Sequence, residues 1–168
     1  MVKRGSIEIS FGMIFSVIII ITIIGVAVYA ITAFLQVGKT AQLGLFHREF
    51  QKTVDEIWSS ATTNKLVSFA IPTSIEAVCF GSIEGREIQG RYSEEFEDLK
   101  KYSSGFEQKN NNVFLYPSQK AKDFAFNKID KLDLSGLGEF DCFETKNGEV
   151  KIRLSKGEFD SLVKVGHE

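Results

Sequence analysis

The sequence predicts an α+β protein. An N-terminal transmembrane helix continues as an amphipathic helix, which packs on a small, mainly antiparallel β-sheet domain outside the membrane. Two observations predict this fold class: residues 9–38 contain no charged side chain, and the chain after them is polar with short apolar runs of strand length. With 168 residues, there is room for one globular domain at most. We divide the chain into a short basic N-terminus (1–10), a transmembrane helix (11–35), an amphipathic helix or stalk (36–62) and a β-rich domain (63–168).

The apolar segment is long enough to cross a membrane. Phe11 to Leu35 supplies 25 uncharged residues, and about 20 cover a hydrocarbon core of ~30 Å. Most of them are Ile, Val or Phe, each of which favours insertion by roughly 0.3–0.6 kcal/mol. A buried core helix is the less favoured alternative. The segment also exceeds the roughly 7–15 apolar residues of a cleaved secretory signal, so we expect a retained anchor.

Charges that flank the segment indicate its orientation. Lys3 and Arg4 precede it, and Lys and Arg are enriched on the cytoplasmic side of membrane helices. We therefore expect a cytoplasmic N-terminus, a C-terminal domain outside the cell membrane, and the lipid bilayer as a partner.

Beyond residue 38 the apolar residues recur at helical spacing. They stand three and four positions apart with charged residues between them, which predicts an amphipathic helix with one buried stripe. The stripe consists of Leu43, Phe46, Phe50, Val54, Ile57 and Ala61. The helix is expected to end in the polar stretch Ser59–Asn64. At Gly38 the sequence leaves two alternatives open, a tolerated glycine in one continuous helix or a hinge.

The rest of the chain contains short apolar runs typical of strands, with breaks at Pro72 and Pro117. The strand candidates are Leu66–Ile71, Ile75–Phe80, Val113–Tyr116, Asp123–Ile129, Glu139–Glu144 and Glu149–Leu154. Ser93–Tyr102 is predicted to form a small acidic helix with Ser93 as its N-cap. An antiparallel sheet under the long helix would bury the apolar stripe.

Asn147 and Gly148 predict a tight turn between the last two strand candidates. A two-residue turn would pair Phe143 with Ile152, whereas a three-residue loop would pair Cys142 with Ile152. We prefer the three-residue loop, because a slip of one residue exchanges the two faces of a strand and burial decides between them. This register places on one face the residues Phe140, Cys142, Val150, Ile152 and Leu154.

The two cysteines, Cys79 and Cys142, both lie on strand candidates. Ile75, Ala77 and Cys79 form an apolar set that alternates with the polar Glu76, so the Cys79 side chain is expected to point inward. In an extracytoplasmic domain these features favour a disulfide over the alternative of two free buried thiols. Closing the long loop between them would stabilise the fold by roughly 4 kcal/mol in the chain-entropy model.

The sequence contains no recognisable catalytic or cofactor signature. His47 and His167 lack companions at metal-ligand spacing, and no nucleophile with a matching base is identifiable. We therefore expect no enzymatic activity, no cofactor and no metal. The chain carries 20 Lys and Arg against 22 Asp and Glu, a net charge of −2. Nucleic-acid binding needs a positive field and is not expected.

The N-terminal region resembles a known family. KRG at residues 3–5, followed by SIEISFGMIFSVIIII, an amphipathic helix and a β-rich end, resembles archaeal type IV pilin-like proteins with a class III signal peptide. The resemblance implies that a prepilin-type peptidase cuts between Gly5 and Ser6, and that subunits self-associate through the retained helix. The family typically has a glutamate at the fifth mature position, whereas here Glu8 is third and Ser10 fifth. The remainder resembles uncharacterised archaeal membrane-anchored proteins, which implies no activity.

Three residues near the helix start have roles that do not depend on this resemblance. Glu8 would stabilise the positive end of the helix dipole by roughly 0.3–1 kcal/mol. Gly12 and Ser16, four positions apart, would let a second helix approach closely, with chance placement of small residues as the alternative. Two functions follow: a pilin-like subunit of a surface filament or secretion machine, or an anchored outer domain that binds a protein partner or ligand without catalysis.

Overall fold

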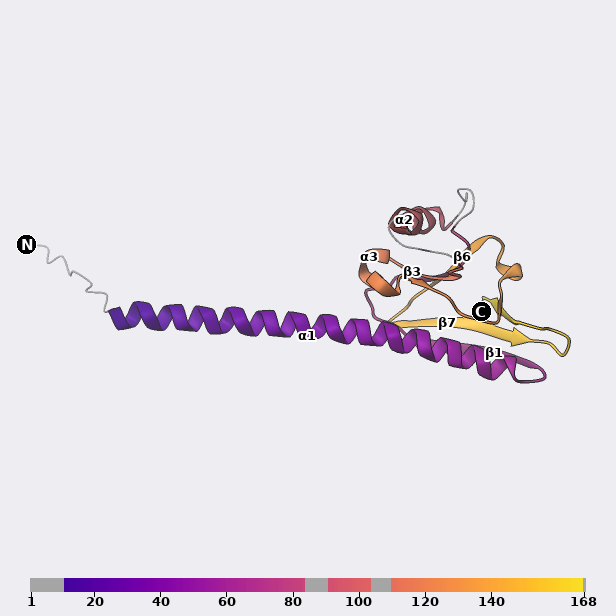
Figure 1. Ribbon diagram of the computed structural model, residues 1–168, viewed down its shortest axis with the longest axis horizontal. Coiled ribbons are helices and arrows are strands. Elements are labelled where there is room, and N and C mark those ends of the chain that lie inside the picture. Colours follow the sequence, from indigo (N-terminus) through magenta and orange to yellow (C-terminus); the bar gives the residue numbers. More distant parts are fainter. Residues whose placement is uncertain (1–10, 84–90, 104–109, 168) are drawn as a thin grey trace, which may run out of the picture. The chain divides into compact units, whose positions relative to one another are not determined.

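The computed structural model describes residues 11–83, 91–103 and 110–167 (Figure 1). The chain forms two compact units, residues 1–38 and residues 39–168. Its fold class is α+β, with one long apolar N-terminal helix and a small domain of mainly antiparallel strands. The long helix, α1 (Phe11–Trp58), contributes residues to both units.

In the first unit, the described residues form the beginning of α1, and all of their side chains are exposed. Polar side chains there bond back to the helix: Ser16 Oγ donates to the carbonyl oxygen of Gly12 and Thr22 Oγ1 to that of Ile18, each at 2.8 Å. α1 continues through Gly38 without a break, so this glycine is tolerated within a continuous helix. By length and composition, α1 is sufficient to cross a membrane.

In the second unit, the C-terminal part of α1 supplies the apolar stripe of the core. The buried residues are Leu43, Phe46, Phe50, Val54 and Ile57, which confirms the predicted helical spacing. The helix ends at Trp58, immediately before the polar stretch that was expected to stop it. Ala61, the sixth predicted member, is exposed because it lies beyond the end of the helix.

Among the described residues, the strands of the second unit form two sheets of four strands each, where the sequence predicted one sheet. The first sheet has the order β1 (Thr63–Ala70), β7 (Glu149–Lys156), β8 (Val163–Gly166) and β5 (Leu132–Asp133). The second has the order β4 (Phe126–Asn127), β3 (Val113–Tyr116), β2 (Ala77–Gly81) and β6 (Phe140–Glu144). Neighbours are antiparallel except β5 and β8, which are parallel.

Short helices complete the unit. They are α2 (Ser93–Ser103), α3 (Ser118–Ala121) and the 3-10 helices η1 (Lys122–Phe124) and η2 (Ser135–Leu137). α2 is the predicted acidic helix. It begins at Ser93 and buries Phe96 and Leu99, as its spacing indicated.

Two apolar clusters occupy the opposite faces of the second sheet. Successive side chains of a strand point to opposite faces, so Val78 and Phe80 on β2 face the larger cluster, whereas Ala77 and Cys79 face the smaller one. The larger cluster joins the α1 stripe to both sheets, and Figure 1 shows the C-terminal part of α1 alongside β1 and β7. The smaller cluster lies between the second sheet and α2.

Phe50 connects α1 to both sheets. Its ring centroid lies 5.1 Å from that of Phe69 on β1 and 5.8 Å from that of Phe80 on β2, and it stacks on Phe46 at 5.9 Å. Aromatic pairs in such geometries contribute about 0.5–1.5 kcal/mol beyond the area they bury. Since Phe69 belongs to the first sheet and Phe80 to the second, one side chain joins the two.

One strand prediction was wrong, and two strands were not predicted. Residues 123–129 do not form one strand, because the Ala125 N–H donates locally to the Lys122 carbonyl (3.0 Å) and closes η1, after which only the two residues of β4 pair. β5 and β8 were not predicted. They contain two and four residues, too few for an alternating period to stand out.

The turn between β6 and β7 also differs from the preferred prediction. Lys146 and Glu149 exchange two backbone hydrogen bonds (2.8 and 3.0 Å), and Asn147 and Gly148 have φ of 54° and 77°. This is a two-residue turn of the I′ kind and not a three-residue loop. After this single bridge, β6 pairs with β2 and β7 pairs with β1 and β8. The apolar side chains of β6 and β7 are buried by the packing of two different sheets. Burial therefore does not favour either register between β6 and β7.

Cys79 and Cys142 form a disulfide in the smaller cluster. They are direct partners in the register of β2 and β6, and both are fully buried. The bond closes a sequence separation of 63 residues. It therefore links β6, the last strand of the second sheet, covalently to its neighbour β2.

Replacing Phe50 tests how strongly α1 holds the two sheets. Phe50→Ala is expected to lower the free energy of unfolding by about 3–5 kcal/mol, because it removes a fully buried ring and leaves a cavity. The measurement is urea denaturation of the full chain in mild detergent, followed by the fluorescence of Trp58, the one tryptophan in the chain. Leu45→Ala is the matched control, since Leu45 lies on the same helix but is 51% exposed. Similar losses for both variants would contradict this role of Phe50.

Removing the disulfide tests its contribution to stability. A variant carrying Cys79→Ala and Cys142→Ala is expected to lose about 2–5 kcal/mol of unfolding free energy, because the unfolded chain gains the freedom of a long open loop. Wild-type protein treated with a reductant should show a comparable loss. Two free thiols in native, non-reduced protein, detected by alkylation and mass spectrometry, would contradict the bond itself.

Candidate functional site: the β6–β7 cleft

A cleft opens where β6 and β7 leave their shared turn for different sheets. Its volume is about 590 Å³. Cys142, Phe143 and Glu144 line it from β6, and Glu149 and Lys151 line it from β7. Arg91, Tyr92, Lys146, Asn147 and His167 complete the lining. We refer to this set of residues as the β6–β7 cleft.

The backbone of β6 presents hydrogen-bonding groups to the cleft. β6 is the last strand in the order of its sheet. The Thr145 N–H donates to the Glu76 carbonyl (2.8 Å), and backbone groups alternate in direction along an antiparallel ladder. The N–H and C=O groups of Cys142 and Glu144 therefore point away from β2. In agreement with this direction, the Cys142 N–H donates to Oδ1 of the neighbouring Asp141 (2.9 Å).

Each carboxylate at the cleft has a partner. Glu144 forms an ion pair with Arg91, whose guanidinium donates to Oε1. Glu149 Oε2 accepts a hydrogen bond from the Ser68 hydroxyl (2.9 Å). At the margin, Asp141 Oδ2 lies 2.6 Å from His167 Nε2.

Aromatic rings form part of the cleft wall. The His167 ring stacks on Phe143, with centroids 4.2 Å apart, and the Arg91 guanidinium lies 5.3 Å from the Tyr92 ring centroid. Burial raises the pKa of the Tyr92 phenol, and the hydrogen bond to Glu144 raises the pKa of Arg91. At neutral pH the wall therefore presents an uncharged phenol beside a permanent cation.

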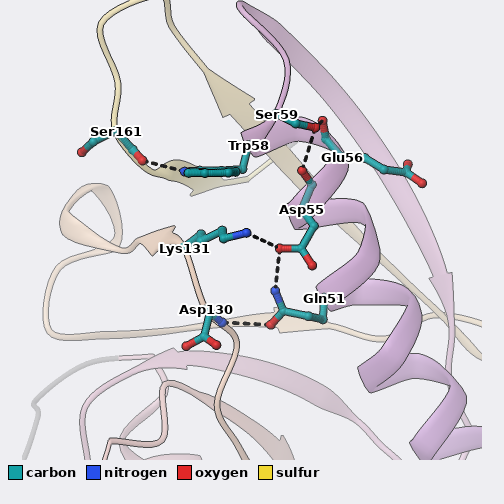
Figure 2. A network of polar contacts seen from close by, with 8 residues as sticks. All are labelled: Gln51, Asp55, Glu56, Trp58, Ser59, Asp130, Lys131 and Ser161. Carbon is teal, nitrogen blue, oxygen red and sulfur yellow. Dashed lines mark hydrogen bonds and ion pairs between the residues drawn. The ribbon is translucent and has the colours of Figure 1, made fainter.

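A second polar cluster lies at the C-terminal end of α1 and fixes two loops to the helix (Figure 2). Lys131 Nζ contacts Asp55 Oδ1 (3.0 Å) and lies 4.1 Å from the Trp58 ring centroid. The Trp58 indole donates to the Ser161 carbonyl (2.9 Å), and Gln51 Oε1 accepts from the Asp130 N–H (2.9 Å). These groups satisfy one another, so we assign this cluster a structural role and treat the cleft as the candidate site.

The residues predicted from sequence are distributed as follows. Gly5, Ser6 and Glu8 lie outside the described residues. Gly12 and Ser16 lie on the exposed first part of α1, and their role in helix packing stays a prediction.

Sequence reasoning missed the cleft altogether. Arg91 and Glu144 are 53 positions apart, and His167 and Asp141 are 26 apart, so no local spacing signals either pair. His167, which lacks companions at metal-ligand spacing in the sequence, has the carboxylate of Asp141 as a partner in the structure. Among the described residues, no group of three or more His, Cys, Asp or Glu side chains could hold a metal ion.

Comparison with known proteins adds no further assignment. The chain matches no protein-family model, no curated protein and no solved structure.

Neutralising Lys131 tests the structural role of the α1 cluster. Lys131→Met keeps the aliphatic stem but removes the charge beside Asp55 and Trp58, and is expected to cost about 1 kcal/mol of unfolding free energy. Lys128→Met is the control, because the pair that Lys128 forms with Asp130 is more exposed (57% and 66%) than that of Lys131 with Asp55 (35% and 45%). Urea denaturation monitored by Trp58 fluorescence measures both, and equal effects would contradict the assignment.

Proposed function

We propose that this chain is a single-pass membrane protein that holds a disulfide-linked α+β domain outside the cell, and that it serves as a pilin-like subunit of a surface filament or secretion machine. The observation that carries the proposal is the change within α1. Up to Gly38 every described side chain of the helix is exposed and uncharged, whereas after Lys39 one apolar stripe is buried in a domain. An exposed apolar helix of this length must be covered by lipid or by other helices, and its length suits a lipid bilayer.

The polar groups of the apolar segment support insertion. The hydroxyls of Ser16, Thr22 and Thr32 all bond to carbonyl oxygens of their own helix, at 2.8 to 3.1 Å. In hydrocarbon an unsatisfied hydroxyl is costly, and bonding within the helix removes most of this cost.

The disulfide supports the outer location of the domain. Disulfides persist in oxidising compartments and are rare in a reducing cytosol. The placement of Lys3 and Arg4 before the helix agrees with a cytoplasmic N-terminus.

The pilin-like assignment is supported by the resemblance of residues 3–21 together with one further feature. In that family the apolar helix is retained and its second half carries a small domain, and α1 has the same two-part composition. The alternative function is an anchored domain that binds a protein partner or ligand without catalysis, which is favoured by the β6–β7 cleft.

N-terminal sequencing of the protein extracted from membranes tests the pilin-like assignment. The mature chain is expected to begin at Ser6. A Gly5→Leu variant should keep its original N-terminus, because the residue before the cut is changed, while Gly12→Leu, within the helix, should still be cut. An intact Met1 or Val2 start in the wild type would reject processing and favour the alternative function.

Protease treatment of intact cells tests the topology separately. The domain beyond Lys39 is expected to be degraded, and its protection would place it in the cytoplasm. Absence of the protein from sheared surface appendages would reject the filament role even for a processed chain.

A further inference from the structure

We propose that Asn147 is a site of spontaneous deamidation, and that the isoaspartate formed there opens the turn between β6 and β7. The modification is an intramolecular ring closure that needs no enzyme and no reactant besides water. Asn147 lines the β6–β7 cleft within the second unit. The inference is therefore independent of membrane insertion and of filament assembly.

The reaction begins at the main-chain nitrogen of Gly148. After losing its proton to hydroxide, this nitrogen bonds to the side-chain carbonyl carbon (Cγ) of Asn147, and the side-chain nitrogen leaves as ammonia. The product is a succinimide ring, whose closure is favoured because the reacting atoms belong to adjacent residues. Water then opens the ring. Opening at Cγ gives aspartate, whereas opening at the main-chain carbonyl carbon gives isoaspartate, in which the main chain runs through the former side chain.

The first argument is that both reacting groups are free. Asn147 is exposed, and no polar contact holds its carboxamide among the described residues. The paired hydrogen bonds of the turn join Lys146 to Glu149 (2.8 and 3.0 Å), so within the described part of the chain the Gly148 N–H has no acceptor. Gly148 also has no side chain that would hinder its nitrogen from approaching Cγ.

The second argument is the contrast with other asparagines. Asn147 is the one asparagine of the sequence that precedes a glycine. The carboxamide of Asn112 is held on both sides, because its Nδ2 donates to the Ile129 carbonyl and its Oδ1 accepts from the Ile129 N–H, each at 2.8 Å. Asn127 Nδ2 donates to the Phe124 carbonyl (2.6 Å). Deamidation is therefore expected at Asn147 ahead of Asn112 and Asn127.

The third argument is the close packing of the turn. The Gly148 carbonyl accepts a hydrogen bond from the Ile71 N–H (2.8 Å). A Cβ added to Gly148 would lie 3.3 Å from both the Ile71 carbonyl oxygen and Cγ2 of Thr73. The turn thus lies against the segment that follows β1, and its main chain has little room to lengthen.

The two products differ in their effect on this turn. Isoaspartate adds one methylene carbon to the main chain, which disturbs the positive φ angles of Asn147 (54°) and Gly148 (77°). The hydrogen bond from Ile71 and the pair between Lys146 and Glu149 are then expected to break. Aspartate keeps the normal main chain and tolerates the left-handed conformation as asparagine does. The isoaspartyl form alone should therefore open the turn.

The first test incubates the full chain in detergent micelles and follows each asparagine by peptide mapping and mass spectrometry. Asn147 is expected to convert to aspartate and isoaspartate, while Asn112 and Asn127 stay amides. The rate should rise with pH, since the attacking nitrogen must be deprotonated. In urea, conversion of Asn147 should be at least about fivefold faster, because the hydrogen bonds of the turn no longer restrain the main chain.

Variants verify the reacting groups. Asn147→Gly keeps a pair of residues suited to the same turn but removes the carboxamide, and its peptide should show no mass change. Gly148→Ala is compared with the wild type in urea, where strain in the folded turn has no influence. Its added methyl group should slow conversion of Asn147 by at least about fivefold.

Hydrogen exchange tests the opening of the turn. After separation of the isoaspartyl form, the amides of Ile71 and Glu149 should exchange at least about tenfold faster than in the unmodified chain. Asn147→Asp is the matched control, because it carries the same added charge on a normal main chain. Its exchange at these two amides should change by less than about twofold.

Several results would overturn the proposal. Asn147 that stays an amide in the native chain, or conversion of Asn112 at the same rate, would reject the site. Aspartate without isoaspartate would reject ring closure. Unchanged exchange at Ile71 and Glu149 in the isoaspartyl form would reject the opening of the turn.

Discussion

Burial of the α1 stripe against two sheets is the interaction on which the second unit depends. Both sheets include a two-residue strand, and small sheets of short strands are not stable without a packed face. Phe50 meets Phe69 of one sheet and Phe80 of the other, so the helix supplies the face that each sheet lacks. In this two-sheet arrangement β6 and β7 belong to different sheets, and the cleft lies where the two strands diverge.

Two other devices, a disulfide and a polar cluster, stabilise parts of the second unit that the α1 stripe does not contact. The Cys79–Cys142 bond secures the face of the second sheet that packs on α2. The cluster around Lys131 secures loops of the chain to the last turns of α1 through Asp55 and Trp58. The first device is covalent and the second is polar and partly exposed, so the two respond to different conditions: reduction weakens the first, and high salt weakens the second.

Features with a local cause could be predicted from the sequence. The buried stripe from Leu43 to Ile57 follows from helical spacing, and the bounds of β3 and the start of α2 at Ser93 follow from composition. The division into two sheets could not be predicted, because Asn147 and Gly148 report only a turn, while the partners of β6 and β7 are set by residues far away in the sequence. The cleft could not be predicted for the same reason, because its lining residues come from distant parts of the sequence. Gly5 and Ser6, which flank the implied cleavage site, and Glu8, at which the sequence departs from the family pattern, lie outside the described residues, so their roles remain predictions.

Asp141 has a consequence for how copies of this protein avoid one another. An open strand edge invites sheet-to-sheet aggregation, which natural proteins suppress with charged groups and short edges. One carboxylate oxygen of Asp141 occupies the outward N–H of Cys142, and the other holds His167 in place beside it. The remaining opening is only a few backbone groups long. A strand of a second copy would thus find few backbone groups on this edge with which to pair.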